Sequence, residues 1–365
     1  MKAHSQSRLV LLYGLLITVL LSGAGSVRGA TPSTVAFPTA PAPRAGAAAP
    51  ATGNVAYLPL LIAPGSSGPT LGGCPLFPAD NIWNTPVDQL PVHPNSADYI
   101  DTMGENTGLH PDFGSGVWPP GSDSPIGIPF VVAPGDQPMV PVDFIWWPDE
   151  SDPGPYPIPG DAPIEGGPNS SGDRHVLVLQ QEACMLYELF YAEPQGDGSW
   201  TAGNGASYDL HSHALRPDGW TSADAAGLPI LPGLVRYDEV ASGEIRHALR
   251  FTAPQTQDAH IWPARHDASS LTGPDYPPMG LRVRLRADFD LSGFPAEVQV
   301  ILQGLKTYGM ILADNGSAWY ISGAPDERWD NDALHDLGDV TGGDFEVVDV
   351  TSLMIDPDTG QAQQP

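Results

Sequence analysis

The stretch DLHSHALRPDGWTSADAAGLPILPGLVRYDEV, residues 209–240, gathers histidines, carboxylates and arginines whose spacing could support chemistry. Asp209, His211 and His213 alternate, so on a strand all three would point to one face of a sheet. Imidazoles and a carboxylate are typical zinc ligands, and His266 could complete the set from another loop. The spacing predicts a metal site, with zinc as the first candidate and calcium as the second. Alternatively, the two histidines only line a polar face.

A carboxylate pair is the other chemistry that the sequence offers. Glu188 lies in residues 184–191, on a strand face whose other positions are apolar, so burial should raise the pKa of its carboxyl as a general acid requires. Asp209 is expected on a neighbouring strand, and Asp224 and Glu239 are acids of the opening stretch. Two carboxyl groups a few ångströms apart are the machinery of glycoside hydrolysis.

Each candidate also has a structural interpretation. Glu188 could be satisfied by an arginine such as Arg174 or Arg216, and Glu239 could be an ordinary helix-turn residue. His247 lies on the apolar face of its strand, where it either bonds a backbone carbonyl or acts as a general base near Glu239.

The segment TSADAAGLP, residues 221–229, is also explained by local geometry alone. Ser222 can cap a single helical turn, Gly227 can end it, and Pro229 prevents its continuation.

Aromatic and basic side chains suggest what could bind. Arg216, Trp220 and Trp262 are the candidate substrate contacts, because indoles in loops can stack on sugar rings through their apolar faces. The alternative is that the tryptophans close the ends of a core. Residues 282–286 carry three arginines on one strand face, which could hold an anionic sugar or pair with acids on the adjacent strand. The tryptophans in or beside predicted loops are Trp146, Trp147, Trp200, Trp220, Trp262 and Trp319.

The charge of the chain narrows the class of partner. Its formal net charge is −28 at pH 7, and such a surface repels nucleic acid and anionic lipid. The expected partner is an extracellular polysaccharide or other glycan.

The N-terminus predicts export. Residues 1–30 combine Lys2 and Arg8 with an apolar run and small residues, as in a secretory signal peptide, so we expect a secreted or cell-surface protein without a membrane segment after cleavage. The two cysteines, Cys74 and Cys184, are then expected to form a disulfide. Residues 31–72 have the composition of a linker, residues 73–350 of a single β-rich domain, and residues 351–365 of a disordered tail.

Short alternating runs separated by turn residues predict a mainly β fold, a sandwich or barrel-like antiparallel domain. Residues 128–133 and 139–147 resemble a hairpin, residues 174–215 a meander, and residues 310–323 a hairpin on Asn315-Gly316. One or two short helices are expected near the C-terminus. The better one is FPAEVQVILQGLKTYG, and the other is DNDALHDLG.

Several segments together resemble a family of exported β-rich bacterial proteins from filamentous and actinobacterial lineages. They are ADNIWNTPV, RPDGWTSADAAGLPILPGLVRYDEV, GEIRHALRF, IWPARH, PPMGLRVRL and LKTYGMILADNG, and the resemblance covers roughly residues 74–350. It implies a secreted single domain and no particular reaction.

The sequence thus favours a secreted carbohydrate-active protein, a polysaccharide hydrolase with a carboxylate pair drawn from Glu188, Asp209, Asp224 and Glu239. A non-catalytic surface protein that binds glycan or a divalent cation is the first alternative. A zinc-dependent hydrolase is the second.

Overall fold

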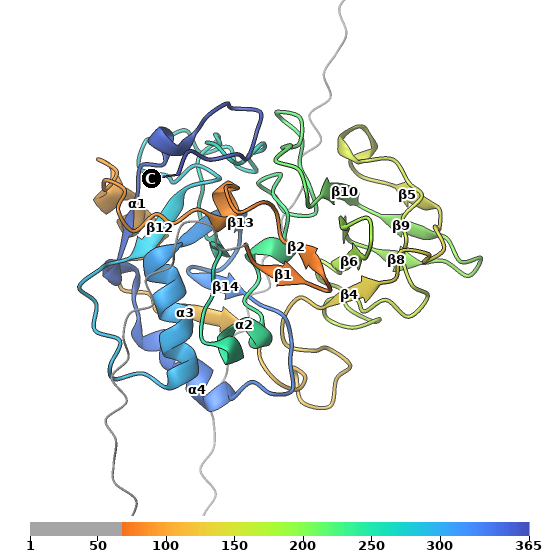
Figure 1. Cartoon of the computed structure of the whole chain (residues 1–365), viewed down its shortest axis with the longest axis horizontal. Coiled ribbons are helices and arrows are strands. Elements are labelled where there is room, and N and C mark those ends of the chain that lie inside the picture. The colour runs from red at the N-terminus through yellow and green to blue at the C-terminus, as the bar shows by residue number, and fades with distance from the viewer. Residues whose placement is uncertain (1–67, 365) are drawn as a thin grey trace, which may run out of the picture. The chain divides into compact units, whose positions relative to one another are not determined.

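A large mixed sheet forms one side of the protein (Figure 1). The computed structural model describes residues 68–364, which lie in one compact unit, and the predicted signal peptide and most of the predicted linker fall outside them. The six strands run in the order β15-β12-β13-β11-β14-β3. They are β3 (His110–Asp112), β11 (Leu249–Ala253), β12 (Arg282–Leu285), β13 (Met310–Asn315), β14 (Tyr320–Ser322) and β15 (Phe345–Val347).

Four α-helices contact this sheet or each other: α1 (Ser96–Met103), α2 (Tyr237–Ser242), α3 (Ala296–Thr307) and α4 (Asn331–His335). The two C-terminal helices confirm the prediction. Pro295 precedes α3, and Gly309 follows it at φ +63°, where a Cβ would meet the Val283 carbonyl oxygen at 2.1 Å. The Asp330 side chain caps α4 by accepting from two backbone N–H groups. Helices α1 and α2 were not predicted.

The remaining short helices are single turns of 3₁₀ type that connect the larger elements. They are η1 (Ile82–Asn84), η2 (Pro148–Glu150), η3 (Leu231–Gly233), η4 (Asp336–Asp339), η5 (Gly342–Asp344) and η6 (Thr351–Leu353).

A four-stranded sheet, in the order β10-β7-β6-β4, forms a middle layer. Leu177, Leu179 and Leu186 on one face join the main core, whereas Val178 and Leu189 on the other face join a second core. Both faces are therefore covered, which confirms that residues 184–191 include a central strand. The strands are β4 (Phe130–Ala133), β6 (Val176–Gln180), β7 (Met185–Phe190) and β10 (Asn204–Asp209).

A three-stranded sheet, in the order β5-β9-β8, contributes to the second core through Val142 and Trp200. Its strands are β5 (Val142–Phe144), β8 (Glu193–Pro194) and β9 (Trp200–Ala202). The protein is mainly β and built as layered open sheets. The predicted mainly β fold is confirmed. Each of these three sheets contains a parallel pair, so the sheets are mixed where antiparallel pairing was predicted.

The predicted strand pairings fail where the true partner is distant in sequence. Strand β4 pairs with β6 and β5 with β9, both in parallel, so residues 128–147 contain no hairpin. Strand β9 leaves the expected meander for the third sheet. Strand β11 lies between β13 and β14, parallel to the first and antiparallel to the second, so these two strands do not form the predicted hairpin.

The predicted disulfide is present. Cys74 and Cys184 are bonded, and both are buried. The bond ties a small ribbon of β1 (Thr70–Leu71) and β2 (Cys74–Pro75) to the turn before β7. With 110 residues separating the cysteines, the chain-entropy model gives a stabilisation of about 4–5 kcal/mol.

The C-terminal segment corrects the predicted disordered tail. Residues 351–364 pack on the domain: Gln361 bridges to Asn81, Met354 bridges to Ala362, and Ala362 is buried. Between residues 68 and 364, no helix has the length and apolar character needed to cross a bilayer.

The arginine strand β12 alternates as predicted, but the face expected to meet solvent is covered. Arg282 is buried and donates to the carbonyl oxygens of Tyr308 and Thr85. Arg284 pairs with Glu346 on the adjacent strand β15 at 2.8 Å. The stripe is therefore mostly structural.

Candidate functional site

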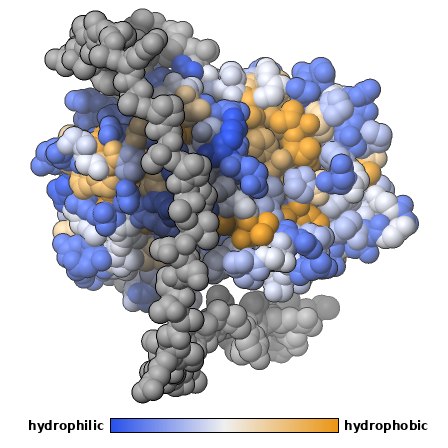
Figure 2. Space-filling model, turned by 90° about the horizontal axis from the view of Figure 1, so that it is seen from below, coloured by the Kyte–Doolittle hydropathy of each residue, from blue (hydrophilic) through white to orange (hydrophobic). Residues whose placement is uncertain are grey.

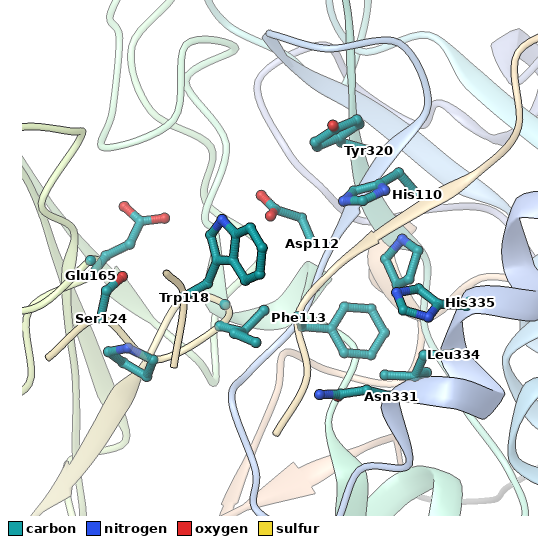
Figure 3. Close-up of a pocket in the computed structure, with 15 residues that line it drawn as sticks. His110, Asp112, Phe113, Trp118, Ser124, Glu165, Tyr320, Asn331, Leu334 and His335 are labelled. Carbon is teal, nitrogen blue, oxygen red and sulfur yellow. The ribbon is translucent and has the colours of Figure 1, made fainter. Parts of the chain in front are cut away.

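A pocket of about 640 Å³ opens beside the β3 edge of the large sheet (Figure 3). Strand β3 supplies His110 and Asp112, and strand β14 supplies Tyr320. A loop of residues 113–127 and the long loop that carries Glu165 close other sides, and α4 adds Leu334 and His335. One cavity is thus built from parts of the chain that are far apart in sequence: residues 110–127, the loop that carries Glu165, and residues 320–335.

Pairing at the sheet edge positions the first carboxyl group. Strand β3 runs parallel to β14, with Tyr320 opposite His110 and Ser322 opposite Asp112. Because strand side chains alternate, His110 and Asp112 point to the same side. The His110 ring stacks on Tyr320 with 4.0 Å between centroids, which fixes one wall next to the Asp112 carboxyl.

The second carboxyl group, Glu165, is held by a histidine. Glu165 Oε2 lies 2.6 Å from His175 Nδ1, and the other ring nitrogen lies 2.9 Å from the Ala223 carbonyl oxygen. Both nitrogens face acceptors, so both carry a proton and the ring is an imidazolium. Burial opposes this charge, but the Glu165 carboxylate outweighs it and raises the pKa of His175 to about 9.

The pKa values of the two pocket carboxyl groups move in opposite directions. Burial alone would raise the pKa of Glu165, but the charge and hydrogen bonds of His175 hold it below its usual range. The pKa of Asp112 is raised, first because surrounding protein displaces water and then because Glu165 repels its negative charge. Asp112 nevertheless remains open to solvent at the pocket wall. Opposite shifts within one pocket are the pattern of an acid and a base.

A buried arginine lies behind the pair. Arg250 on β11 donates to both oxygens of Asp224, at 2.8 and 2.7 Å, and also to the Ser322 hydroxyl. Its charge lowers the pKa values of both Asp112 and Glu165. Asp314, 4.0 Å from the same guanidinium, has a pKa raised to about 7 by burial and by repulsion from Asp224. Arg250 thus links the pocket to the charged interior.

The rest of the pocket wall is largely apolar or aromatic. Trp118 is 68% exposed, and in Figure 3 its indole is drawn between the carboxyl groups of Asp112 and Glu165. Phe113, Ile126 and Leu334 complete this side. A flat exposed indole beside two carboxyl groups suits a ligand that has both apolar faces and hydroxyl edges.

Two predicted catalytic carboxylates, Glu188 and Asp224, are sealed inside. Glu188 is fully buried and accepts from the backbone N–H groups of Ile230 and Leu231 at the start of η3. As predicted, burial raises its pKa, to about 7. The side chain of Asp224 is 0% exposed and occupied by Arg250. Neither arginine expected to satisfy Glu188 contacts it: Arg174 donates to backbone carbonyl oxygens and Arg216 pairs with Asp152. Neither carboxylate meets solvent.

Glu239 and His247 come together, as one alternative anticipated, but as a separate structural cluster. Glu239 lies in α2, 2.7 Å from Arg236 Nη2 and 3.1 Å from His247 Nε2. His247 Nδ1 lies 2.8 Å from the Ala248 carbonyl oxygen, the backbone bond that the alternative predicted. These residues lie outside the lining of the pocket.

The predicted metal ligands are not assembled. Strand β10 ends at Asp209, whose carboxylate accepts the His211 N–H and turns the chain. His213 instead contacts Asp80 at 3.1 Å, and His266 Nδ1 lies against the Ala225 carbonyl oxygen. Among residues 68–364, no three histidine, cysteine or acidic side chains are grouped as a metal would require. The predicted alternation of the three ligands does not occur, because strand β10 ends at the first of them, Asp209.

The predicted sugar contacts also lie outside the pocket. Arg216 is buried, pairs with Asp152 at 2.6 Å and lies over the Trp220 ring at 5.5 Å. The indole N–H of Trp262 donates to the Thr359 carbonyl oxygen. These three side chains connect loops.

Three residues of the site were not predicted from the sequence: Asp112, Glu165 and His175. Asp112 lies in a strand of only three residues, too short for a periodic signal. Glu165 lies in the proline- and glycine-rich loop before β6, and the length of that loop was the available signal, because long irregular loops are commonly functional. Comparison with protein-family models, curated proteins and solved structures gave no match.

Proposed function

We propose that this protein is a secreted glycoside hydrolase that acts on a neutral polysaccharide, with Asp112 and Glu165 as its carboxylate pair. The observation that carries the proposal is that two carboxyl groups from different walls face one solvent-open pocket and have oppositely shifted pKa values. Hydrolysis of a glycosidic bond requires one protonated and one ionised carboxyl group.

The shifts assign the roles. Asp112, with the raised pKa, donates a proton to the departing glycosidic oxygen. Glu165, kept ionised by His175, acts at the anomeric carbon, directly as a nucleophile or through a water molecule. His175 is a positioning residue that acts through Glu165. The anomeric form of the first product, observed by NMR, distinguishes the two routes.

The substrate class follows from the walls and the charge. Trp118 and Tyr320 offer flat faces to sugar rings, and the net charge of −28 disfavours polyanions. The Cys74–Cys184 disulfide fits an oxidising compartment, which supports secretion.

The test is hydrolysis of a panel of neutral polysaccharides by the wild-type protein and by Asp112→Asn. We expect the variant to lose roughly 10²–10⁴-fold in kcat, the usual contribution of a general acid. His211→Asn, a change at one of the predicted metal ligands and outside the pocket, is the matched control and should retain full activity.

The same panel decides between this proposal and a non-catalytic glycan-binding protein. Binding of a polysaccharide without release of reducing ends by the wild-type protein would favour the binding protein. Equal turnover by wild type and Asp112→Asn would remove Asp112 from the mechanism.

A further inference from the structure

A cluster of aromatic rings, two exposed and two half-buried, lies outside the pocket, and we call it the aromatic platform. It consists of Trp146, Trp147, Phe190 and Tyr191. Trp146 and Trp147 are 46% and 40% exposed, and the Trp146 ring lies 4.5 Å from Tyr191 and 5.8 Å from Trp147. Apolar patches occur elsewhere too, as on the face seen in Figure 2. In the platform, however, the exposed rings are in mutual contact. Large exposed apolar side chains in contact mark interaction sites.

The platform is held rigidly by the backbone. The N–H groups of Trp146 and Trp147 both donate to the Gly203 carbonyl oxygen. Gly203 must be glycine, because a Cβ there would lie 2.7 Å from the Trp146 ring. Tyr191 has a φ of +52°, a left-handed conformation that is unusual in a non-glycine residue and is concentrated at ligand sites. The rings are therefore ordered before any ligand arrives.

The platform is connected to the pocket by one histidine. The Phe190 ring packs against His175 with 5.6 Å between centroids, and His175 bonds Glu165 in the pocket wall. The Tyr191 N–H donates to the backbone carbonyl oxygen of Asp173, two residues before His175. His175 thus contacts both the platform, through Phe190, and the proposed catalytic carboxylate of Glu165.

The charges beside the platform select the type of ligand. Asp149 and Glu150 follow the two tryptophans in η2. The neighbouring cation, Arg174, is buried and donates to the carbonyl oxygens of Ala192, Pro168 and Ser170. Because the Arg174 guanidinium already donates to backbone carbonyl oxygens, it does not offer a positive charge to a ligand. The platform therefore favours uncharged rings over anionic ones.

We propose that the aromatic platform is a second binding site for the same neutral polysaccharide, separate from the cleavage pocket and stacking sugar rings of the chain on Trp146 and Trp147. The choice of polymer rests on the proposed function. Two sites joined through His175 suit a long chain, because a polymer held at one site presents itself to the other at high effective concentration.

The experiment measures binding separately from cleavage. The Asp112→Asn protein is tested by affinity electrophoresis against mixed-linkage β-glucan, arabinoxylan, galactomannan and amylose, with polygalacturonate as the anionic polymer. In this background we expect Trp146→Ala and Trp147→Ala each to weaken binding of at least one neutral polymer about tenfold or more. Trp146→Phe, which keeps a packed ring, should lose less.

Ile355→Ala is the matched control, because Ile355 is an exposed apolar residue, 55% accessible, outside the platform. It should bind as the parent does, and thermal unfolding verifies that each variant is folded. Unchanged binding in folded Trp146→Ala and Trp147→Ala overturns the proposal, as does binding of none of the four neutral polymers or equal binding of polygalacturonate. Binding that depends on the platform, in a wild-type protein that cleaves nothing, would retain the platform and overturn the hydrolase.

Discussion

Two glutamate–histidine pairs occur within residues 68–364, and they differ in what surrounds them. Glu165 and His175 lie 2.6 Å apart, and Glu239 and His247 lie 3.1 Å apart. In each pair the second ring nitrogen faces a backbone carbonyl oxygen. Only Glu239 also receives an arginine, Arg236, and only Glu165 borders the pocket.

The difference indicates what would let the same two residue types serve structure in one place and the proposed chemistry in the other. Burial opposes ionisation of Glu239, yet Arg236 and His247 together lower its pKa to about 2, and its oxygens are fully used. Glu165 has one close cationic partner and a pocket in front of it. A carboxylate becomes available for reaction when a single partner keeps it charged and leaves one side open.

The largest expected difference between the two pairs is in activity, when each glutamate is neutralised in turn. Glu165→Gln should lose roughly 10²–10⁴-fold in kcat on the polysaccharide that the wild type cleaves, because the reacting charge is gone. Glu239→Gln should keep kcat close to wild type. Steady-state release of reducing ends measures both, and an equal loss in the two variants would place both pairs in the same role.

Stability should respond in the opposite order. In Glu239→Ala, Arg236 stays buried with a charge that it cannot lose, so we expect a destabilisation of about 3–5 kcal/mol. In Glu165→Ala, His175 can release its proton, so the cost should be smaller, about 1–3 kcal/mol. Urea unfolding at neutral pH measures both variants, and a larger loss for Glu165→Ala would contradict the distinction.

The smallest expected effect is a shift in the pH dependence of kcat/KM when His175 is replaced. In the proposed mechanism Glu165 is ionised and Asp112 protonated, so kcat/KM should fall at low pH as Glu165 gains a proton and at higher pH as Asp112 loses one. His175→Gln removes the charge that lowers the pKa of Glu165, so the acid limb should move to higher pH. The matched variant His247→Gln should leave that limb in place, and an unmoved limb in His175→Gln would separate His175 from catalysis.

Much of the local structure could be predicted from the sequence. Pro295, Glu297 and Gly309 defined α3, two cysteines in a chain with a predicted signal peptide indicated the disulfide, and the apolar faces of residues 184–191 defined a covered strand. These features depend on residues near one another or on a pairing with one solution. Strand partners do not, because alternation gives the face of a strand and not its neighbour.

The candidate site could not be predicted from the sequence, because it also depends on which distant segments meet. The raised pKa of Glu188 was correctly predicted from its apolar face, but nothing in that pattern shows that the backbone of Ile230 and Leu231 would seal it. Asp112 and Glu165 meet only through tertiary structure, one from a three-residue edge strand and one from an irregular loop. A cavity between distant segments produces no periodic pattern in the amino-acid sequence.

Strand β11 also constrains how the chain reaches this structure. Because β11 lies between β13 and β14, the short connection at Asn315-Gly316 must stay open until a strand from before α3 enters and pairs with both. Local hairpins close within microseconds, whereas pairing across a long loop is slow, so β13 and β14 have time to pair incorrectly with each other. We expect slow folding with an early off-pathway hairpin, and the residues at the pocket edge, next to β14, to be among the last to reach their native positions.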